Sequence, residues 1–219
     1  DTALIRNNLV SRAKEVGYLP SWSKGAVANV SVTVVPTTSP NTVTISSDTT
    51  FSSSIDDLTL TFSNVNDVVI TPNSSGGYIE SNMQLVEGLP LTHKYTVSTS
   101  NAVDYLIPNE NADLTNLTVT VQESAASSNV QSYSYANDIT ELSGTSKVYF
   151  LEEDDDKKYR VYFGDGVIGK SLTDGNVVIL KYRVCNTTTG NGARTFAAPT
   201  SIDGHTTIAV STVSVSSGG

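Results

Sequence analysis

The chain has 219 residues and a mass of 23.2 kDa, which is enough to bury a core in one large or two small domains. Its net charge of −9 and pI near 4.5 argue against a nucleic-acid-binding surface, because such a surface needs clustered Lys and Arg. Only 16% of the residues are charged, and abundant Ser, Thr and Asn between short Val, Ile and Leu runs favour β-structure over helix.

Residues 1–20 are expected to form a helix and a connector. Apolar side chains recur at helical spacing, at Ile5, Leu9, Ala13 and Val16. The helix is expected from about Ala3 to Val16, because Gly17 stands where a helix commonly ends. Tyr18 and Trp22 follow it, and we expect Trp22 either to anchor the junction between helix and sheet or to contribute to an interface.

Residues 21–103 are expected to form the first part of a β-domain. Apolar and polar residues alternate there with the two-residue period of a strand. The strands are predicted near residues 27–35, 43–45, 58–62, 68–71, 83–87 and 91–99. No helical pattern separates them, so the chain is expected to be mainly β, with the N-terminal helix followed by an antiparallel sandwich or barrel-like domain.

The rest of the chain divides by composition into three further segments. Residues 104–142 are a possible inserted β-subdomain, and residues 101–111 before its first strand are expected to be a break. Residues 143–199 are expected to hold a returning hairpin, and residues 200–219 a last strand and a linker that ends in Ser216-Ser217-Gly218-Gly219.

The most informative stretch is Tyr159–Gly169, Tyr-Arg-Val-Tyr-Phe-Gly-Asp-Gly-Val-Ile-Gly. Tyr159, Val161 and Phe163 alternate with Arg160 and Tyr162, as expected for a strand whose side chains point to opposite faces. Glycines then tolerate the positive φ angles of a compact turn, and a second strand is predicted over residues 176–184. The pattern predicts a strand, a Gly-rich connection and a returning strand.

This stretch resembles the baseplate wedge proteins of contractile-tailed bacteriophages, the baseplate-J-like family. The resemblance rests on Phe163–Gly169, on the strand over 176–184 and on Thr-Gly-Asn-Gly-Ala at residues 189–193. A second block, residues 2–34 with Gly-Tyr-Leu-Pro at 17–20, is similar to the segment where the family's helix enters its first β-domain. Between the blocks the chain departs from the pattern, since residues 45–51 lack the Pro and Gly of the family's usual turn.

The resemblance implies a structural subunit and not an enzyme. Such a subunit would be part of a longer protein in the virion's tail baseplate, made in the bacterial cytoplasm, without cofactor and without insertion in a membrane. Its implied partners are a second copy of itself, as a dimer within a ring, and other wedge, hub or sheath proteins. It would rearrange when the sheath contracts. The residues expected to contribute to these interfaces are Tyr18, Trp22, Phe163, Asp165 and Tyr182.

Two other function classes are considered. A receptor-binding or carbohydrate-binding β-module would place aromatic residues on loops, whereas most tyrosines here fall in strand-like runs. A hydrolase would need a site, and the sequence has only two histidines, His93 and His205, with neither a Gly-x-Ser-x-Gly nor a His-Glu-x-x-His motif.

One acidic run could suggest a metal site. Residues 152–156, Glu-Glu-Asp-Asp-Asp, are rich in the oxygen ligands that calcium takes, but they lack the alternating spacing that aims ligands inward. Lys157 and Lys158 follow at once, which favours a solvated hairpin turn. Cys185 is the only cysteine, so an internal disulfide is impossible, and we expect a small buried residue at a strand end.

Overall fold

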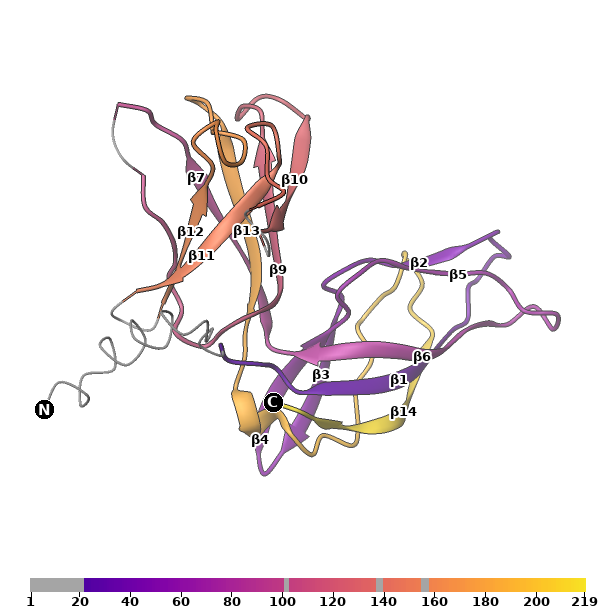
Figure 1. Cartoon of the computed structure of the whole chain (residues 1–219). Coiled ribbons are helices and arrows are strands. Elements are labelled where there is room, and N and C mark those ends of the chain that lie inside the picture. Colours follow the sequence, from indigo (N-terminus) through magenta and orange to yellow (C-terminus); the bar gives the residue numbers. More distant parts are fainter. Residues whose placement is uncertain (1–21, 101–102, 137–139, 155–157) are drawn as a thin grey trace, which may run out of the picture. The chain divides into compact units, whose positions relative to one another are not determined.

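The computed structural model describes residues 22–100, 103–136, 140–154 and 158–219 (Figure 1). The described chain is mainly β, as the sequence predicts, with strands β1 to β14 and one short 3₁₀ helix, η2 (Thr187–Gly190). The predicted helix over residues 3–16 and the predicted interface residue Tyr18 lie outside the described residues.

The chain divides into two units, and each is assembled from segments far apart in the sequence. We call them the barrel unit, with Trp22 and residues 92–112 and 117–182, and the half-barrel unit, with residues 23–91, 113–116 and 183–219. Both units therefore depend on segments from the first and second halves of the chain.

The half-barrel unit is built on a five-stranded sheet in the order β14-β1-β6-β4-β3, with the two-stranded sheet β2-β5 beside it (Figure 1). Its strands are β1 (Val27–Val34), β2 (Val43–Ile45), β3 (Thr50–Ile55), β4 (Leu58–Ser63), β5 (Val68–Ile70), β6 (Tyr78–Glu87) and β14 (Ile208–Ser217). The strand β1 pairs antiparallel with β6 on one side and with the edge strand β14 on the other.

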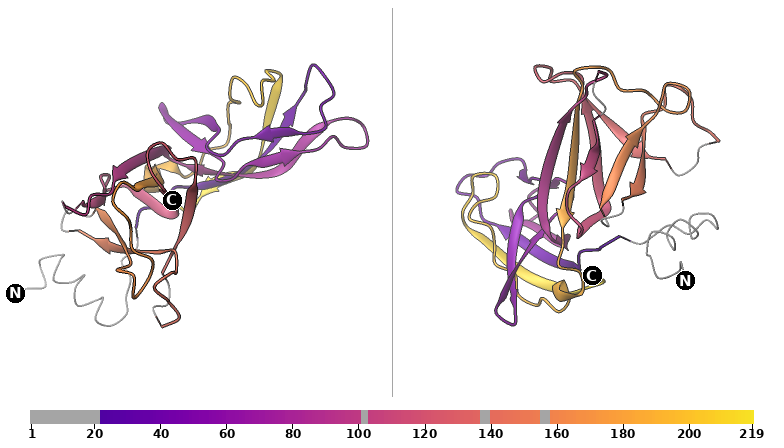
Figure 2. Two further views of the ribbon diagram at one scale, coloured as in Figure 1. Left: turned by 90° about the horizontal axis from the view of Figure 1, so that it is seen from above. Right: turned by 90° about the vertical axis from the view of Figure 1, so that its left-hand side faces the viewer.

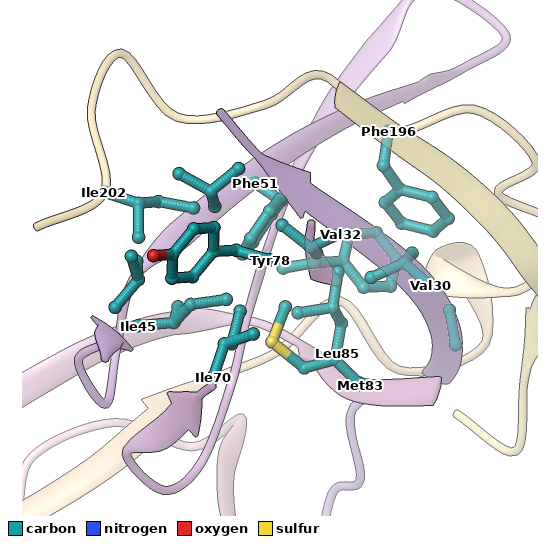
Figure 3. Packing of buried hydrophobic residues seen from close by; sticks show 14 of the residues in the cluster. Val30, Val32, Ile45, Phe51, Ile70, Tyr78, Met83, Leu85, Phe196 and Ile202 are labelled. Carbon is teal, nitrogen blue, oxygen red and sulfur yellow. The ribbon is translucent and has the colours of Figure 1, made fainter. Parts of the chain in front are cut away.

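The core of the half-barrel unit follows from the alternation in β1. Ala28, Val30, Val32 and Val34 are buried, and the polar residues between them are half-buried. Figure 3 shows Val30 and Val32 among residues from distant segments. The ring of Phe196 meets that of Phe62 edge to face at 5.0 Å.

The barrel unit is built on a seven-stranded sheet in the order β7-β13-β9-β10-β11-β12-β8, which curls into a nearly closed barrel (Figure 2). The strands of this sheet are β7 (Leu89–Thr96), β8 (Tyr105–Ile107), β9 (Ala112–Gln122), β10 (Val130–Tyr135), β11 (Val148–Glu153), β12 (Tyr159–Phe163) and β13 (Val177–Val184). Residues 89–91 of β7, 113–116 of β9 and 183–184 of β13 are counted with the half-barrel unit. The edge strands β7 and β8 are joined by the Tyr95 hydroxyl, which donates to the carbonyl oxygen of Leu106. The rings of Tyr95 and Tyr105 also meet edge to face at 5.7 Å.

Several details of the strands differ from the sequence-based expectation. The Ser-rich strand β3 was not predicted, and β8 lies where a break was expected. β10 pairs with β11 in parallel, so the sheet is not purely antiparallel. β14 continues to Ser217, and Asn191 exchanges two hydrogen bonds with the main chain of Gly219, so the expected linker is part of the fold.

Candidate interface site

The Gly-rich turn, which we define as residues 163–169 between β12 and β13, is held by its own hydrogen bonds. The Asp165 Oδ1 accepts from the backbone N–H of Val167 at 2.8 Å and of Ile168 at 3.0 Å. The N–H of Gly166 donates to the carbonyl of Gly169 at 3.0 Å, which closes the turn. This arrangement is the side-chain-capped turn that Asp favours.

The turn is also fastened to the neighbouring loop of residues 143–146. The N–H of Gly169 donates to the Ser143 carbonyl at 3.0 Å, and Lys170 donates to that of Ser146 at 2.7 Å. The loop and the turn approach so closely that a Cβ on Gly144 would lie 2.0 Å from the carbonyl oxygen of Gly166. The turn therefore has little freedom to move independently of the barrel unit.

This constrained turn presents apolar side chains to solvent within the barrel unit. Val167 is 74% exposed and Ile168 is 46% exposed. The backbone N–H groups of both residues are held by Asp165, so their positions are fixed. A rigid turn with an apolar tip loses little conformational entropy when another protein covers it, and it is the strongest candidate for an interface in this unit.

Asp165 is exposed and lies in the Gly-rich turn, as the sequence predicts. The two backbone N–H groups, that of Ile168 first, lower the pKa of its carboxyl. Because the pKa is lowered in the folded protein, the turn is favoured above the ordinary pKa of Asp and loses this contribution as pH falls. Its role in the described structure is to shape the turn.

Phe163 and Tyr182 are part of the packing of the barrel unit. The ring of Phe163 lies 5.4 Å from that of Tyr105 and 5.5 Å from that of Tyr133, both edge to face. Tyr182 is 3% exposed, and its hydroxyl donates to the Asn109 Oδ1 at 2.7 Å. Neither side chain is on the exposed tip of the turn.

Trp22 is half-buried and packs within the barrel unit. Its ring meets that of Tyr159 edge to face at 6.4 Å. This contact is compatible with the anchoring role expected for Trp22.

The half-barrel unit contains buried charged residues that no sequence pattern indicates. The Glu87 carboxylate is fully buried and accepts from the backbone N of Asn186 at 3.0 Å and from its Nδ2 at 2.7 Å. Burial raises the pKa of Glu87, the hydrogen bonds from Asn186 oppose this shift, and the negative charge of Asp113 adds to it. Burial therefore makes ionisation of this carboxyl less favourable than in water.

Arg183 is the second buried charged residue in this unit. It is 4% exposed, and its Nη2 donates to Asp48 Oδ1 at 2.8 Å and to the Asn64 carbonyl at 2.9 Å. Burial lowers the pKa of the guanidinium, and the charges of Asp48 and Asp113 oppose that shift. The contacts fix the chain between distant segments, so we assign them a structural role.

The acidic run over residues 152–156 lies only partly within the described structure, because residues 155–157 are outside it. No group of three or more His, Cys, Asp or Glu gathers within the described residues. Glu152 and Glu153 lie in β11, which pairs antiparallel with β12, and the Asp154 N–H donates to the Lys158 carbonyl at 2.7 Å, as expected for two strands joined by a hairpin. Cys185 is buried, as expected, and burial raises the pKa of its thiol.

The described part of the chain contains no helix long and apolar enough to cross a membrane. The comparisons with known proteins add no family. Neither a scan against protein-family models nor a search of curated proteins gives a match to this chain.

Proposed function

We propose that this chain is a structural subunit of the baseplate wedge of a contractile phage tail, and that the Gly-rich turn is one of its contact surfaces. In such a baseplate, wedge subunits surround a central hub, hold the sheath and rearrange on contraction. The expected partners are a second copy of the chain and other wedge, hub or sheath proteins.

The observation that carries this proposal is the structure of the segment with the strongest family resemblance. Phe163–Gly169 forms a turn that is hydrogen-bonded internally and to residues 143–146, with Val167 and Ile168 exposed at its tip. A purely structural connection between two strands needs the glycines, but it gains nothing from exposed apolar residues at its tip. If another subunit covers the turn, both its constrained conformation and its apolar tip are explained.

A second feature is compatible with assembly. The edge strand β14 exposes Val213 and Val215, and all ten of its residues are uncharged. Edge strands of monomeric proteins are usually protected by charges or Pro, and β14 has neither. An assembled particle can protect such an edge by covering it.

Cross-linking mass spectrometry on intact phage particles that contain the chain tests this proposal. Lys170 follows the turn directly, so a lysine-reactive reagent reports the proteins that lie beside it. We expect cross-links from Lys170 to tail or baseplate proteins, including a second copy of the chain. Particles that lack the chain, or cross-links restricted to a fibre tip, would overturn the proposal.

A matched pair of variants tests the role of the turn. Val167→Ser with Ile168→Ser removes the apolar tip and leaves the glycines and Asp165 intact. Val69→Ser is the control, because Val69 is 59% exposed and lies in the other unit. We expect the double variant to lower the yield of complete particles while Val69→Ser assembles normally, with both folding like the unsubstituted chain. Equal yields would remove the turn from the interface.

The alternative of a carbohydrate-binding module has no comparable support. Its signature would be aromatic rings grouped on exposed loops. The rings of Tyr105 and Tyr133 instead each contact the ring of Phe163 within the barrel unit. Strong binding on a glycan array, with no tail assembly defect in variants of the chain, would make it the better reading.

A further inference from the structure

The sheet of the half-barrel unit has a gap beside β6. On one side, β6 pairs with β1 from Tyr78 to Val86. On the other side, its pairing with β4 includes only Phe62 with Glu87 and Ser63 with Val86. Beyond Ser63 the chain leaves β6, so most of this edge of β6 has no neighbouring strand among the described residues.

The register shows which main-chain groups face the gap. The N–H of Gly88 donates to the Thr61 carbonyl at 2.9 Å, on the β4 side, and the N–H of Glu87 donates to the Ala26 carbonyl, on the β1 side. Main-chain groups point to alternate sides along an antiparallel strand. Counting back from Gly88, the N–H and C=O of Gln84 point into the gap. They would pair with Val65 if β4 continued.

A buried side-chain oxygen borders the same gap. Asn64 is 1% exposed, and its Nδ2 donates to the carbonyls of Ser46 at 2.9 Å and Asn66 at 2.8 Å. Because carbonyl oxygens only accept, the amide cannot be turned over, and the Asn64 Oδ1 must face the other way. Among the described residues no donor reaches this oxygen. Leaving a buried acceptor unsatisfied is costly, which indicates that something else donates to it.

The gap is a cavity with a volume of about 290 Å³. Its lining combines four carboxamide residues with apolar side chains and carries a single charged residue. The lining residues used here are Asn64, Val65, Asn66, Glu80, Asn82 and Gln84. Figure 3 shows Met83 and Leu85 pointing into the core, and their neighbours Asn82 and Gln84 are exposed. The polar groups are thus available to a ligand, and the volume suits a short segment.

We propose that this gap receives an extended, basic polypeptide segment of a different protein. The segment would continue the sheet by pairing with the N–H and C=O of Gln84. A small shift of the chain around Asn64 would then let the segment donate a hydrogen bond to the Asn64 Oδ1, which is buried in this structure. Strand addition of this kind takes its affinity from main-chain hydrogen bonds and its specificity from alternate side chains. The inference uses the half-barrel unit alone and does not rest on the proposed baseplate function.

Charge decides which protein supplies the segment. Glu80 is the only charged residue of the lining, and the whole chain carries a net charge of −9. A segment with Lys or Arg facing Glu80 is attracted, and because this chain has 13 Lys and Arg against 22 Asp and Glu, a different protein supplies such a segment more readily than a second copy does. No aromatic residue lines the gap, so a sugar ring would lack the stacking surface that it commonly uses. The backbone N–H and C=O of Gln84 match the alternating groups of a peptide backbone better than they match a sugar.

The first test uses a library of seven-residue peptides, capped at both ends, with one Lys scanned through positions of uncharged β-forming residues. Binding to the intact chain is measured by fluorescence anisotropy, and the site is located by NMR hydrogen exchange. We expect a peptide to bind and to slow exchange of the Gln84 amide by about tenfold or more. N-methylation of the peptide amide that faces Gln84 should weaken binding about tenfold, and N-methylation of the next amide should not.

A variant of the chain gives an independent measurement. Gln84→Pro removes the N–H that faces the gap and leaves the groups of Met83 and Leu85 that face β1. Gln84→Ala is the matched control, because it shortens the side chain but keeps the N–H. We expect Gln84→Pro to lose peptide binding and Gln84→Ala to retain it. If Gln84→Pro fails to fold, the N-methylated peptides decide alone.

Four results would overturn the inference. The first is that no peptide binds below about 1 mM, with only an ordered water beside the Asn64 Oδ1. The second is equal weakening by N-methylation at both positions, which indicates contacts with side chains alone. The third is self-association of the chain that Gln84→Pro abolishes, which assigns the gap to a second copy. The fourth is protection of the Gln84 amide by a saccharide and not by any peptide.

Discussion

Glu87 shows how a residue that looks ordinary in the sequence acquires an unusual role through burial. Its carboxylate is fully buried and depends on Asn186, which lies 99 positions further along the chain. Removing a carboxylate from water favours its protonated form, and the donors of Asn186 only partly compensate. The residue therefore links the stability of the half-barrel unit to pH.

The sign of this link can be tested. The pKa of Glu87 is raised in the folded protein, so its contribution is fully present below the ordinary pKa and is lost as pH rises through the raised value. Glu87→Gln cannot titrate at this position. We expect the free energy of unfolding of the unsubstituted chain, relative to Glu87→Gln, to decrease between pH 4 and pH 7. Urea denaturation at both pH values measures it, and a constant difference would contradict the expectation.

Phe163 gives a second test at the scale of a residue. Its ring contacts Tyr105 and Tyr133 edge to face, so Phe163→Ala should remove packing and leave a cavity. We expect a loss of about 3 kcal/mol in the free energy of unfolding, at the lower end for Phe because the side chain is half-buried. Tyr162→Ala, on the exposed face of the same strand, should cost less than about 1 kcal/mol. Similar losses in both would place Phe163 outside the packed interior.

At the scale of elements, the Gly-rich turn depends on a close approach of its two ends. A Cβ on Gly164 would lie 2.2 Å from the carbonyl carbon and oxygen of Gly169, which is far below any normal contact. The clash is with main chain, so no rotation of a side chain relieves it. The turn must shift if Gly164 is replaced.

Gly164→Ala should therefore lower the free energy of unfolding by about 2–3 kcal/mol. Gly76→Ala is the comparison: Gly76 has a positive φ of 78°, which Gly164 does not, but a Cβ on Gly76 would meet nothing within 4 Å. We expect Gly76→Ala to lower the free energy of unfolding by about 1 kcal/mol, which is the cost of placing Ala in the left-handed conformation. Thermal or urea unfolding compares the two variants, and equal losses would mean that the turn adapts without cost.

The elements also show what sequence patterns can and cannot predict. Strands with clear alternation, such as β1 and β12, lie where the pattern places them. β3 escaped prediction because Ser52, Ser53 and Ser54 have no apolar alternation, and its place in the sheet comes from pairing with β4. The turn itself was predictable from its glycines and Asp165, since these residues act locally.

The partners of buried polar groups could not be predicted in the same way. The ion pair between Arg183 and Asp48 joins positions 135 apart, and nothing in either local sequence indicates the other. The same holds for the gap beside β6. It arises because β4 leaves the sheet after Ser63, which is a property of strand pairing and not of residue type.

At the scale of the whole molecule, the interleaving of segments predicts that the half-barrel unit cannot be obtained as one continuous piece. A fragment of residues 23–91 lacks β14, which pairs with β1, and the core residues Ala193, Phe196 and Ile202. We expect this fragment to show no cooperative thermal transition by circular dichroism, whereas the full chain does. A cooperative transition in the fragment would show that the pairing of β1, β6 and β4 within one sheet is sufficient for folding.

The pairing of β1 with β14 also has a consequence for the time course of synthesis. Val27 is aligned with Ser217, so β1 cannot complete its pairing with β14 until nearly 200 further residues have been translated. At about 5–20 residues per second, this interval is roughly 10–40 s. During it, one edge of a valine-rich strand is open on the ribosome. The newly made chain is therefore expected to be a substrate for chaperones that bind nascent polypeptides until the final strand emerges.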